Sequence, residues 1–246
     1  MLTALLSDIH GNREALAACL AHAAASGATR RLFLGDYVGY GADPGWVIDT
    51  VAAEVERGAT AILGNHDAAI AAPDEQMNEI AAAAIAWTRP RLEARHRAFL
   101  RQLPLAVEQQ GRLFVHANAW DPARWGYVTG PAAAARSMAA TRARQTFCGH
   151  VHVPALYHRS ISGKVSEFLP VAGVGIPLLP QRCWLAVIGA VGQPRDRNPA
   201  ACYALFDEAC DLLTYVRVPY DAAGAARKVR EAGLPPVLSL RLEQGY

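Results

Sequence analysis

The feature that most constrains this chain is a short apolar run that ends abruptly in polar residues. Residues 1–7 form the run, and Asp8-Ile9-His10 follows it directly. Such a run is typical of a buried strand, and in a sheet flanked by helices it delivers polar side chains to a crevice at its carboxyl end. Asp8 and His10 can therefore converge on one cation, and a carboxylate with an imidazole favours a transition metal over Ca²⁺ or Mg²⁺. The alternative interpretation is a surface turn in which Asp8 caps the next helix.

The same pattern recurs along the chain, which the surface-turn interpretation does not explain. Five of the eight histidines directly follow short apolar runs, interleaved with Asp and Asn. The recurring polar residues are Asp36, Asn65, His66, His116, His150 and His152. Because strands of one sheet end on a common edge, we expect these side chains to meet there. The set is large enough for two metal ions, with Asp36 as the natural bridge because its strand is expected to neighbour the first.

Strand and helix patterns alternate in the first half of the chain, which predicts a parallel sheet with right-handed crossovers. The expected strands are 1–7, 31–34, 59–63, 105–108, 112–115 and 146–148, and the expected helices are 12–26, 43–57, 74–101 with a break at Pro90, and 131–140. The second half predicts a second, mostly antiparallel sheet. Its expected strands lie near 156–157, 165–168, 184–188, 202–206 and 212–218, and helices are expected at 221–232 and after Pro236.

Composition limits the possible classes of protein. Apolar residues make up 52% of the chain and charged residues 19%, which indicates a sizeable core and argues against disorder. We expect a single domain over residues 1–246, without a membrane span or signal peptide. The formal net charge of +2 is too small to indicate nucleic-acid binding by bulk electrostatics, although it does not exclude nucleic acid. Five cysteines without a CxxC pair predict reduced thiols and a cytoplasmic location.

The strand ends together form five motifs between residues 8 and 152. They are Asp8-Ile9-His10, Gly35-Asp36-Tyr37-Val38-Gly39, Gly64-Asn65-His66-Asp67, Val115-His116 and Gly149-His150-Val151-His152. In this order they resemble the five motifs of calcineurin-like metallophosphoesterases. A less specific resemblance covers Gly192-Gln193-Pro194-Arg195-Asp196 and residues 202–207, which look like the carboxyl half of the small YfcE-like phosphodiesterase branch.

The resemblance implies a fold and a set of roles. The fold is α/β, a four-layer α/β/β/α sandwich of two mixed sheets flanked by helices, with the site at the strand carboxyl ends. Two divalent transition-metal ions are implied, Mn²⁺ first, with Fe, Ni, Zn or Co as alternatives. The implied ligands are Asp8, His10 and His152 for one ion, Asn65, His116 and His150 for the other, and Asp36 for both. His66 is the implied catalytic residue, with Asp67 orienting its imidazole.

Departures from the family pattern narrow the function. Protein-phosphatase members have Asp-Arg-Gly after the second motif, where this chain has Gly39-Tyr40-Gly41, so a protein phosphatase is not expected. Gly39 also replaces the tyrosine ligand of purple acid phosphatases, which argues against a ferric–tyrosinate site. Residues 187–190 replace the Asn-Pro-Gly-Ser of the small phosphodiesterase branch, so the polar substrate contacts of that loop are lost.

The implied activity is hydrolysis of phosphodiesters by a metal-bridging hydroxide, with a small phosphate ester as substrate and nucleotide-derived esters among the candidates. The alternatives are a phosphomonoesterase, a dinucleoside polyphosphate hydrolase and a non-catalytic metal-binding scaffold. Asn12 and Asn118 are candidate substrate-binding residues. The segment from Trp120 to Tyr127 has two interpretations, stacking on a nucleobase or anchoring a long loop. The sequence does not indicate an oligomeric state.

Overall fold

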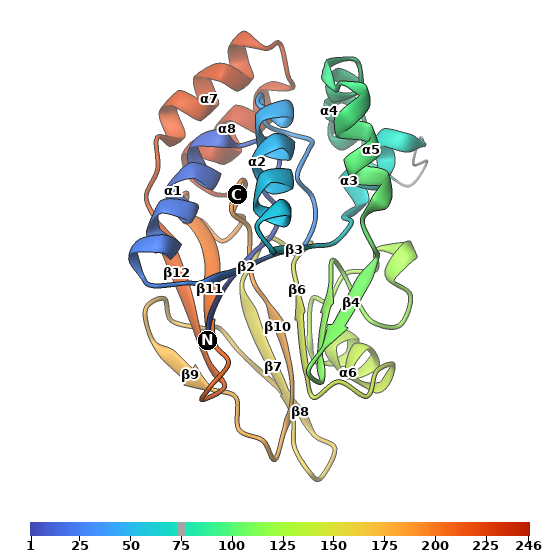
Figure 1. Ribbon diagram of the computed structural model, residues 1–246, viewed down its shortest axis with the longest axis vertical. Helices are drawn as coiled ribbons and strands as arrows, with labels where there is room; N and C mark the ends of the chain where they lie inside the picture. The colour runs from blue at the N-terminus through green and yellow to red at the C-terminus, as the bar shows by residue number, and fades with distance from the viewer. Residues whose placement is uncertain (73–76) are drawn as a thin grey trace.

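The computed structural model describes residues 1–72 and 77–246 and contains two six-stranded sheets that pack face to face (Figure 1). The first sheet has the order β3 (Thr60–Ala61), β2 (Arg30–Phe33), β1 (Leu2–Leu6), β11 (Ala201–Asp207), β12 (Leu212–Val218) and β9 (Gly175–Pro177). The second has the order β4 (Ala106–Gln109), β5 (Arg112–Val115), β6 (Gln145–Cys148), β10 (Cys183–Val187), β7 (Ala155–Arg159) and β8 (Val165–Phe168).

Both sheets are mixed. In the first, β1, β2 and β3 are parallel, whereas β11 pairs antiparallel with β1. In the second, β5, β6 and β10 are parallel, and β4 and β7 are antiparallel to their neighbours. The predicted α/β class with two mixed sheets is confirmed. The prediction that the late strands form their own antiparallel sheet is wrong, because β11 and β12 extend the first sheet while β7, β8 and β10 extend the second.

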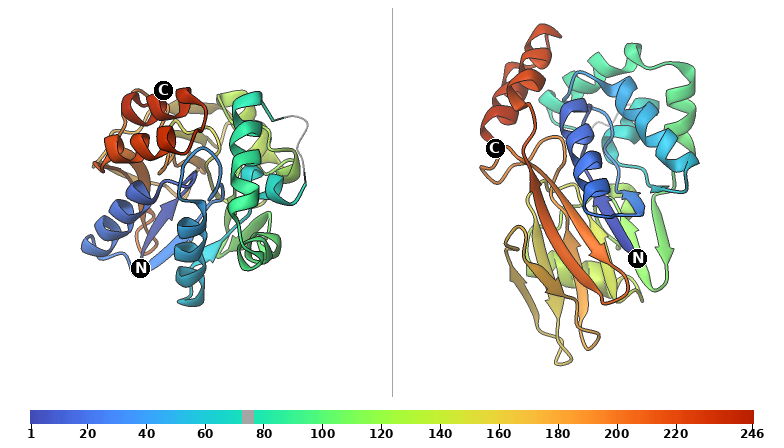
Figure 2. Two further views of the ribbon diagram at one scale, coloured as in Figure 1. Left: turned by 90° about the horizontal axis from the view of Figure 1, so that it is seen from above. Right: turned by 60° about the vertical axis from the view of Figure 1, so that its left-hand side comes forward.

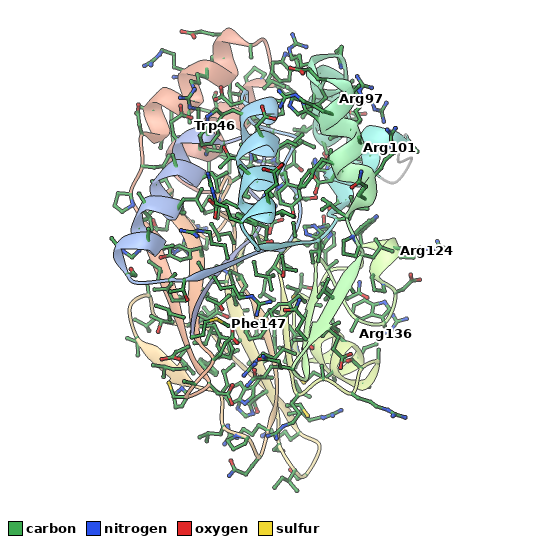
Figure 3. The ribbon with its side chains drawn as sticks, viewed as in Figure 1. Trp46, Arg97, Arg101, Arg124, Arg136 and Phe147 are labelled. Carbon is green, nitrogen blue, oxygen red and sulfur yellow. The ribbon has the colours of Figure 1, made fainter. Side chains whose placement is uncertain are left out.

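The main core lies between the two sheets, whose facing strands are apolar. Phe147 of β6 stacks on Phe114 of β5 at a ring-centroid distance of 5.4 Å and contacts Phe206 of β11 at 5.1 Å. Its side chain therefore joins the two sheets, and Figure 3 shows it among the strands at the centre of the molecule. Strand β1 is buried along nearly its whole length, as expected for a central strand that is covered on both faces.

Helices complete the four layers. Apolar side chains of α1 (Arg13–Ala25) and α2 (Pro44–Glu56) pack on the outer face of the first sheet, and α6 (Pro131–Ala139) packs on the second. The other helices gather beyond the upper ends of the strands (Figures 1 and 2). These are α3 (Asn65–Ala71), α4 (Glu79–Thr88), α5 (Ala94–Gln102), α7 (Ala222–Glu231) and α8 (Pro236–Gln244). Short 3-10 helices lie at Arg89–Arg91, between α4 and α5, and at Pro122–Arg124, in the loop after β5.

Several elements differ from expectation. The third strand is shorter than expected, and Asn65 and His66 form the first turn of α3, because Gly64 provides an extended N-cap and Asp67 accepts its backbone N–H. Strand β9 was not predicted, because it pairs only through the tertiary neighbour β12. The expected break at Pro90 is confirmed, because α4 and α5 are separate helices, whereas the first of them begins only at Glu79 and residues 74–76 lie outside the described residues. Within the described chain, no helix has the length and apolar character needed to cross a membrane.

Candidate metal centre and substrate pocket

The predicted ligands converge at the carboxyl ends of strands from both sheets. Asp8 and His10 follow β1 and Asp36 follows β2 in the first sheet, whereas His116 follows β5 and His150 follows β6 in the second. The expectation that one sheet edge collects all of them is therefore wrong. The cluster forms where the facing edges of two packed sheets meet, so the packing of the sheets determines its geometry.

Left-handed backbone turns aim the ligands inward. Asp8, His10, Asp36, His150 and His152 all have φ between 51° and 68°, a conformation that costs non-glycine residues about 1–3 kcal/mol each. Hydrogen bonds between the turns offset this strain. His10 N–H donates to the Asp36 carbonyl at 2.9 Å, and Asp8 N–H donates to the Gly35 carbonyl at 3.1 Å. Five strained residues in one place indicate that the fold stabilises this arrangement of side chains.

Glycines beside the ligands allow close approach. A Cβ at Gly64 would collide with the Asp36 backbone and carboxylate, and a Cβ at Gly149 would collide with Ser7 and Asp8. Gly35 has a left-handed φ of 92° and turns the chain. Gly64 has φ −103°, so its role is to make room for Asp36 rather than to turn the chain.

The first group of ligands, Asp8, His10 and His152, is called here the enclosed half because its side chains are at most 3% exposed. His10 Nδ1 lies 3.0 Å from the Val38 carbonyl and His152 Nδ1 lies 2.6 Å from the Gln193 carbonyl. Since a carbonyl only accepts, both Nδ1 atoms carry the proton and both Nε2 atoms present lone pairs. These Nε2 atoms face each other at 3.0 Å, and Asp8 Oδ1 lies 3.3 Å from His152 Nε2.

The second group, Asn65, His116 and His150, is called the open half because it borders a pocket. His116 Nδ1 donates to the Leu34 carbonyl at 2.7 Å, so its Nε2 is the ring atom that faces the cluster. This Nε2 lies 3.1 Å from Asn65 Oδ1 and 3.2 Å from His150 Nδ1. His150 thus differs from the other histidines, since its Nδ1 rather than its Nε2 faces the cluster.

A cation is the group that fits between these atoms. In the enclosed half, the Nε2 atoms of His10 and His152 face each other at hydrogen-bond distance with no proton to share, and Asp8 Oδ1 is buried without a partner. Asp36 Oδ2 lies 3.7 Å from His10 Nε2 and 3.4 Å from His116 Nε2, so it connects the two halves. Imidazole, carboxylate and amide donors at such spacing are typical ligands of Mn, Fe, Ni, Co or Zn.

Charge in the cluster is balanced by the histidines. Burial by itself would raise the pKa of Asp36, but His116 and His66 lower it well below its usual range. Burial opposes protonation of His116, yet the Asp36 carboxylate raises the pKa of His116 to about 9. Burial, followed by the charge of His116, lowers the pKa of His150 to about 3. The cluster therefore holds positive charge against its carboxylates, as a metal ion would.

His66 projects beside the ligands. Its ring packs edge-on against His10 at 4.8 Å and Tyr40 at 4.6 Å, its backbone N–H donates to Asp36 Oδ1 at 2.9 Å, and its Nδ1 is buried without a partner. Burial lowers the pKa of His66 to about 4. The ligand-type atoms of His10, Asp36 and His66 also lie close enough for a metal, although the resemblance assigns His66 no ion.

Asp67 has a different position from the one expected. Its carboxylate accepts backbone N–H groups of Asp36 at 2.7 Å, Tyr37 at 2.9 Å and Gly64 at 3.0 Å, and none of these bonds reaches the His66 ring. Asp67 thus positions the loop that carries Asp36 rather than the imidazole of His66.

A pocket of about 120 Å³ adjoins the open half. Asn65, His66 and His150 form its inner wall, and its other lining residues are Tyr40, Met77, Asn78, Ala81, Arg124, Trp125 and Tyr127. Tyr127 stacks on His150 with ring centroids 4.1 Å apart and remains 55% exposed. Arg124 lies at the outer edge of the molecule (Figure 3), so the pocket opens toward solvent on that side.

Both interpretations of the loop from Trp120 to Tyr127, anchoring and stacking, apply to different residues of it. Trp120 packs against the core beneath α6 and under the guanidinium of Arg136, at 4.7 Å, and so anchors the loop. Trp125 and Tyr127 line the pocket. Only these two aromatic residues of the loop are therefore in a position to stack on a substrate.

Asn12 and Asn118 do not line the pocket. Asn12 caps α1 by accepting from Ala15 N–H and donates to the Gly192 carbonyl. Asn118 donates to the Gly126 carbonyl and accepts from Asp121 N–H. Both amides are engaged within the protein, so substrate binding by either would require these bonds to break.

Two further parts of the chain support the metal cluster but were not predicted as site residues. Tyr40, buried with a left-handed φ of 63°, packs on both His10 and His66. The segment 188–196 supports the cluster from behind, because Gln193 binds His152 and Gly192 N–H donates to the Asp8 carbonyl. The resemblance around Gln193 could have indicated this role from the sequence. A segment that packs against the backbone of metal ligands needs a glycine at the point of contact, and Gly192 stands next to Gln193.

The fold and the paired ligand groups define a class of metal-dependent phosphoester hydrolases. The calcineurin-like phosphoesterase superfamily domain matches residues 1–210, and the chain belongs to this family. It is 32% identical to the uncharacterized protein MJ0912 of Methanocaldococcus jannaschii over 99% of this chain and 98% of that protein.

Solved structures agree with the family assignment. The metallophosphoesterase from Sphaerobacter thermophilus superposes with a TM-score of 0.88 and 33% identity, covering 100% of this chain and 99% of the other. The hypothetical protein PH1004 from Pyrococcus horikoshii OT3 superposes with a TM-score of 0.80 and 19% identity, covering 100% and 98%, which supports the fold. The predicted family is confirmed, and the chain is a hydrolase of phosphate esters that uses divalent metal ions. The narrower YfcE-like branch rests on the sequence motifs.

Proposed function

We propose that the protein is a dinuclear-metal phosphodiesterase that acts on small phosphodiesters, including nucleotide-derived ones. The observation that carries this proposal is the pair of ligand groups joined by Asp36, whose Oδ2 lies within 3.7 Å of an imidazole nitrogen from each half. We assign Asp8, His10 and His152 to one ion, Asn65, His116 and His150 to the other, and Asp36 to both.

Two divalent ions would lower the pKa of a water nucleophile and neutralise charge on the phosphoryl oxygens. The chain itself supplies orientation. Carbonyl bonds to Nδ1 fix the rings of His10, His116 and His152, which sets their tautomer and raises their basicity as ligands. Amide Asn65 in place of a third carboxylate limits the negative charge that a phosphate anion meets.

His66 is the proposed catalytic residue. Since its lowered pKa keeps the imidazole neutral near pH 7, it donates a hydrogen bond to a phosphoryl or leaving-group oxygen rather than acting as a fixed cation. Its place between Tyr40 and His10 holds the ring beside Asp36, where the reacting phosphorus would bind.

The pocket beside the open half is the proposed site for an organic group of the ester. Trp125 and Tyr127 line its cavity of about 120 Å³ and give it an aromatic surface. A planar group such as a nucleobase can stack there. Manganese as the native ion and a cytoplasmic location remain predictions from the sequence.

Hydrolysis of bis(p-nitrophenyl) phosphate and p-nitrophenyl phosphate tests this function, using metal-stripped protein with Mn, Ni, Zn or Mg restored. We expect metal-dependent cleavage of the diester, and a fall in kcat of about 100-fold or more in His66→Ala. His22→Ala, at an exposed histidine of α1, is the matched control. Faster monoester cleavage would favour a phosphatase, and two bound ions without turnover would favour a scaffold.

A further inference from the structure

We propose that Arg195 binds a non-bridging oxygen of the substrate phosphoryl group, a role that rests on the proposed function and names a residue of the same site. Three observations point to this role. The backbone at Arg195 is rigid, its guanidinium has an N–H without a partner, and only the ring of Tyr40 lies between it and His66.

The backbone of residues 192–195 is fixed directly to the enclosed half. Gly192 N–H donates to the Asp8 carbonyl at 2.9 Å, and Arg195 N–H donates to the His152 carbonyl at 3.2 Å. His152 Nδ1 in turn donates to the Gln193 carbonyl at 2.6 Å. Arg195 is therefore held in register with a metal ligand, so its side chain starts from a defined point beside the cluster.

The guanidinium of Arg195 retains unused hydrogen-bonding capacity. One Nη donates to Gln193 Oε1 at 3.1 Å, while Nε is shielded from solvent without a partner. The adjacent carboxylate, Asp196, pairs with Arg217 instead. A shielded N–H without an acceptor is costly, and an oxyanion is the partner that a planar guanidinium fork fits best.

Tyr40 connects this guanidinium to the reacting centre. The Arg195 Cζ lies 5.6 Å from the centre of the Tyr40 ring, and that ring lies 4.6 Å from His66 and 4.5 Å from His10. Tyr40 is 6% exposed, so it offers a firm surface on which the guanidinium lies. Arg195 thus approaches from the enclosed half, while Trp125 and Tyr127 approach from the open half.

Inorganic phosphate is the probe that isolates this contact. Its affinity for metal-loaded protein is measured by calorimetry and by inhibition of diester hydrolysis, with metal content determined in parallel. In Arg195→Gln we expect phosphate binding to weaken by about 10-fold to 100-fold, the range for a lost charged hydrogen bond, with both ions retained. The control Arg197→Gln removes an exposed arginine two positions further on and should change phosphate binding less than about twofold.

Arg195→Met keeps an apolar stem against Tyr40 and decides the question if Arg195→Gln does not fold. Phosphate affinity within twofold of the parent in either folded variant would overturn the proposal, as would a parent protein that binds two ions but no phosphate. Phosphate binding that depends on Arg195 in a protein without esterase activity would instead leave this proposal standing and remove the proposed function.

Discussion

The enclosed and open halves of the metal cluster each contain two histidines, with Asp8 in the first and Asn65 in the second, but they are supported differently. In the enclosed half, backbone carbonyls fix both imidazoles and the segment 188–196 closes the rear. In the open half, Asn65 is half-buried and His150 is covered on one side by Tyr127, which is itself 55% exposed. From this comparison we expect the enclosed half to hold its ion more tightly and the open half to face the substrate.

The largest effect should come from Asp36, which the two halves share. Asp36→Asn removes the charge that faces both His10 and His116, so we expect the ion content to fall below two and the rate to fall by about 1,000-fold. Metal analysis and kcat/KM measure the two effects. Asp121→Asn, at an exposed loop position, is the control, and two retained ions with a rate within tenfold of the parent would show that the halves are independent.

Removal of metal should distinguish the two halves by the time at which each loses its ion. We expect a chelator to extract the ion of the open half first and that of the enclosed half later, since burial slows exchange. Complete removal of both ions should lower Tm by roughly 10–20 °C, the combined effect on a chain of this size of two ions that are each present at about 100 times their Kd. Metal content and Tm are followed together. Simultaneous loss of both ions would contradict the comparison, and an unchanged Tm would contradict the cation site.

Asp67 tests the support of the open half. The carboxylate of Asp67 accepts hydrogen bonds from backbone N–H groups through both of its oxygens. Asp67→Asn replaces one of these acceptors by an N–H₂ donor, so we expect a loss of about 2–3 kcal/mol in the free energy of unfolding. Metal affinity should weaken by about 10-fold to 100-fold, as for other supporting groups. Urea denaturation and metal titration give the two values. Asp49→Asn alters an exposed ion pair with Arg95 and should cost no more than about 1 kcal/mol.

The smallest effect is expected at Tyr127, which covers His150 but touches no ligand of the enclosed half. Tyr127→Ala should raise KM for an aromatic diester about threefold to tenfold through lost stacking, with ion content unchanged. Tyr127→Phe keeps the ring and serves as the matched control, with KM near the parent value. Equal KM in all three proteins would show that the pocket does not bind the ester group.

The sequence by itself determined the family, the fold class and the ligand types. Short apolar strands that end in Asp, Asn or His are local patterns, and the order of their five motifs is specific, so Asp8, Asp36 and His116 could be found without a structure. Helix boundaries such as Asn12 and Pro44 were also local, because a cap depends on neighbours in the chain.

The tertiary structure alone decided how the strands were divided between sheets and which atoms face one another. Pairing of β11 with β1 joins residues 200 positions apart, and no local pattern states which apolar strand will be its neighbour. The same holds for Asn12 and Asn118, whose amides form hydrogen bonds within the protein. It also holds for Arg195, whose position over Tyr40 depends on how the segment 188–196 packs behind the metal cluster. Composition and spacing specify which groups are available, whereas packing specifies which of them meet.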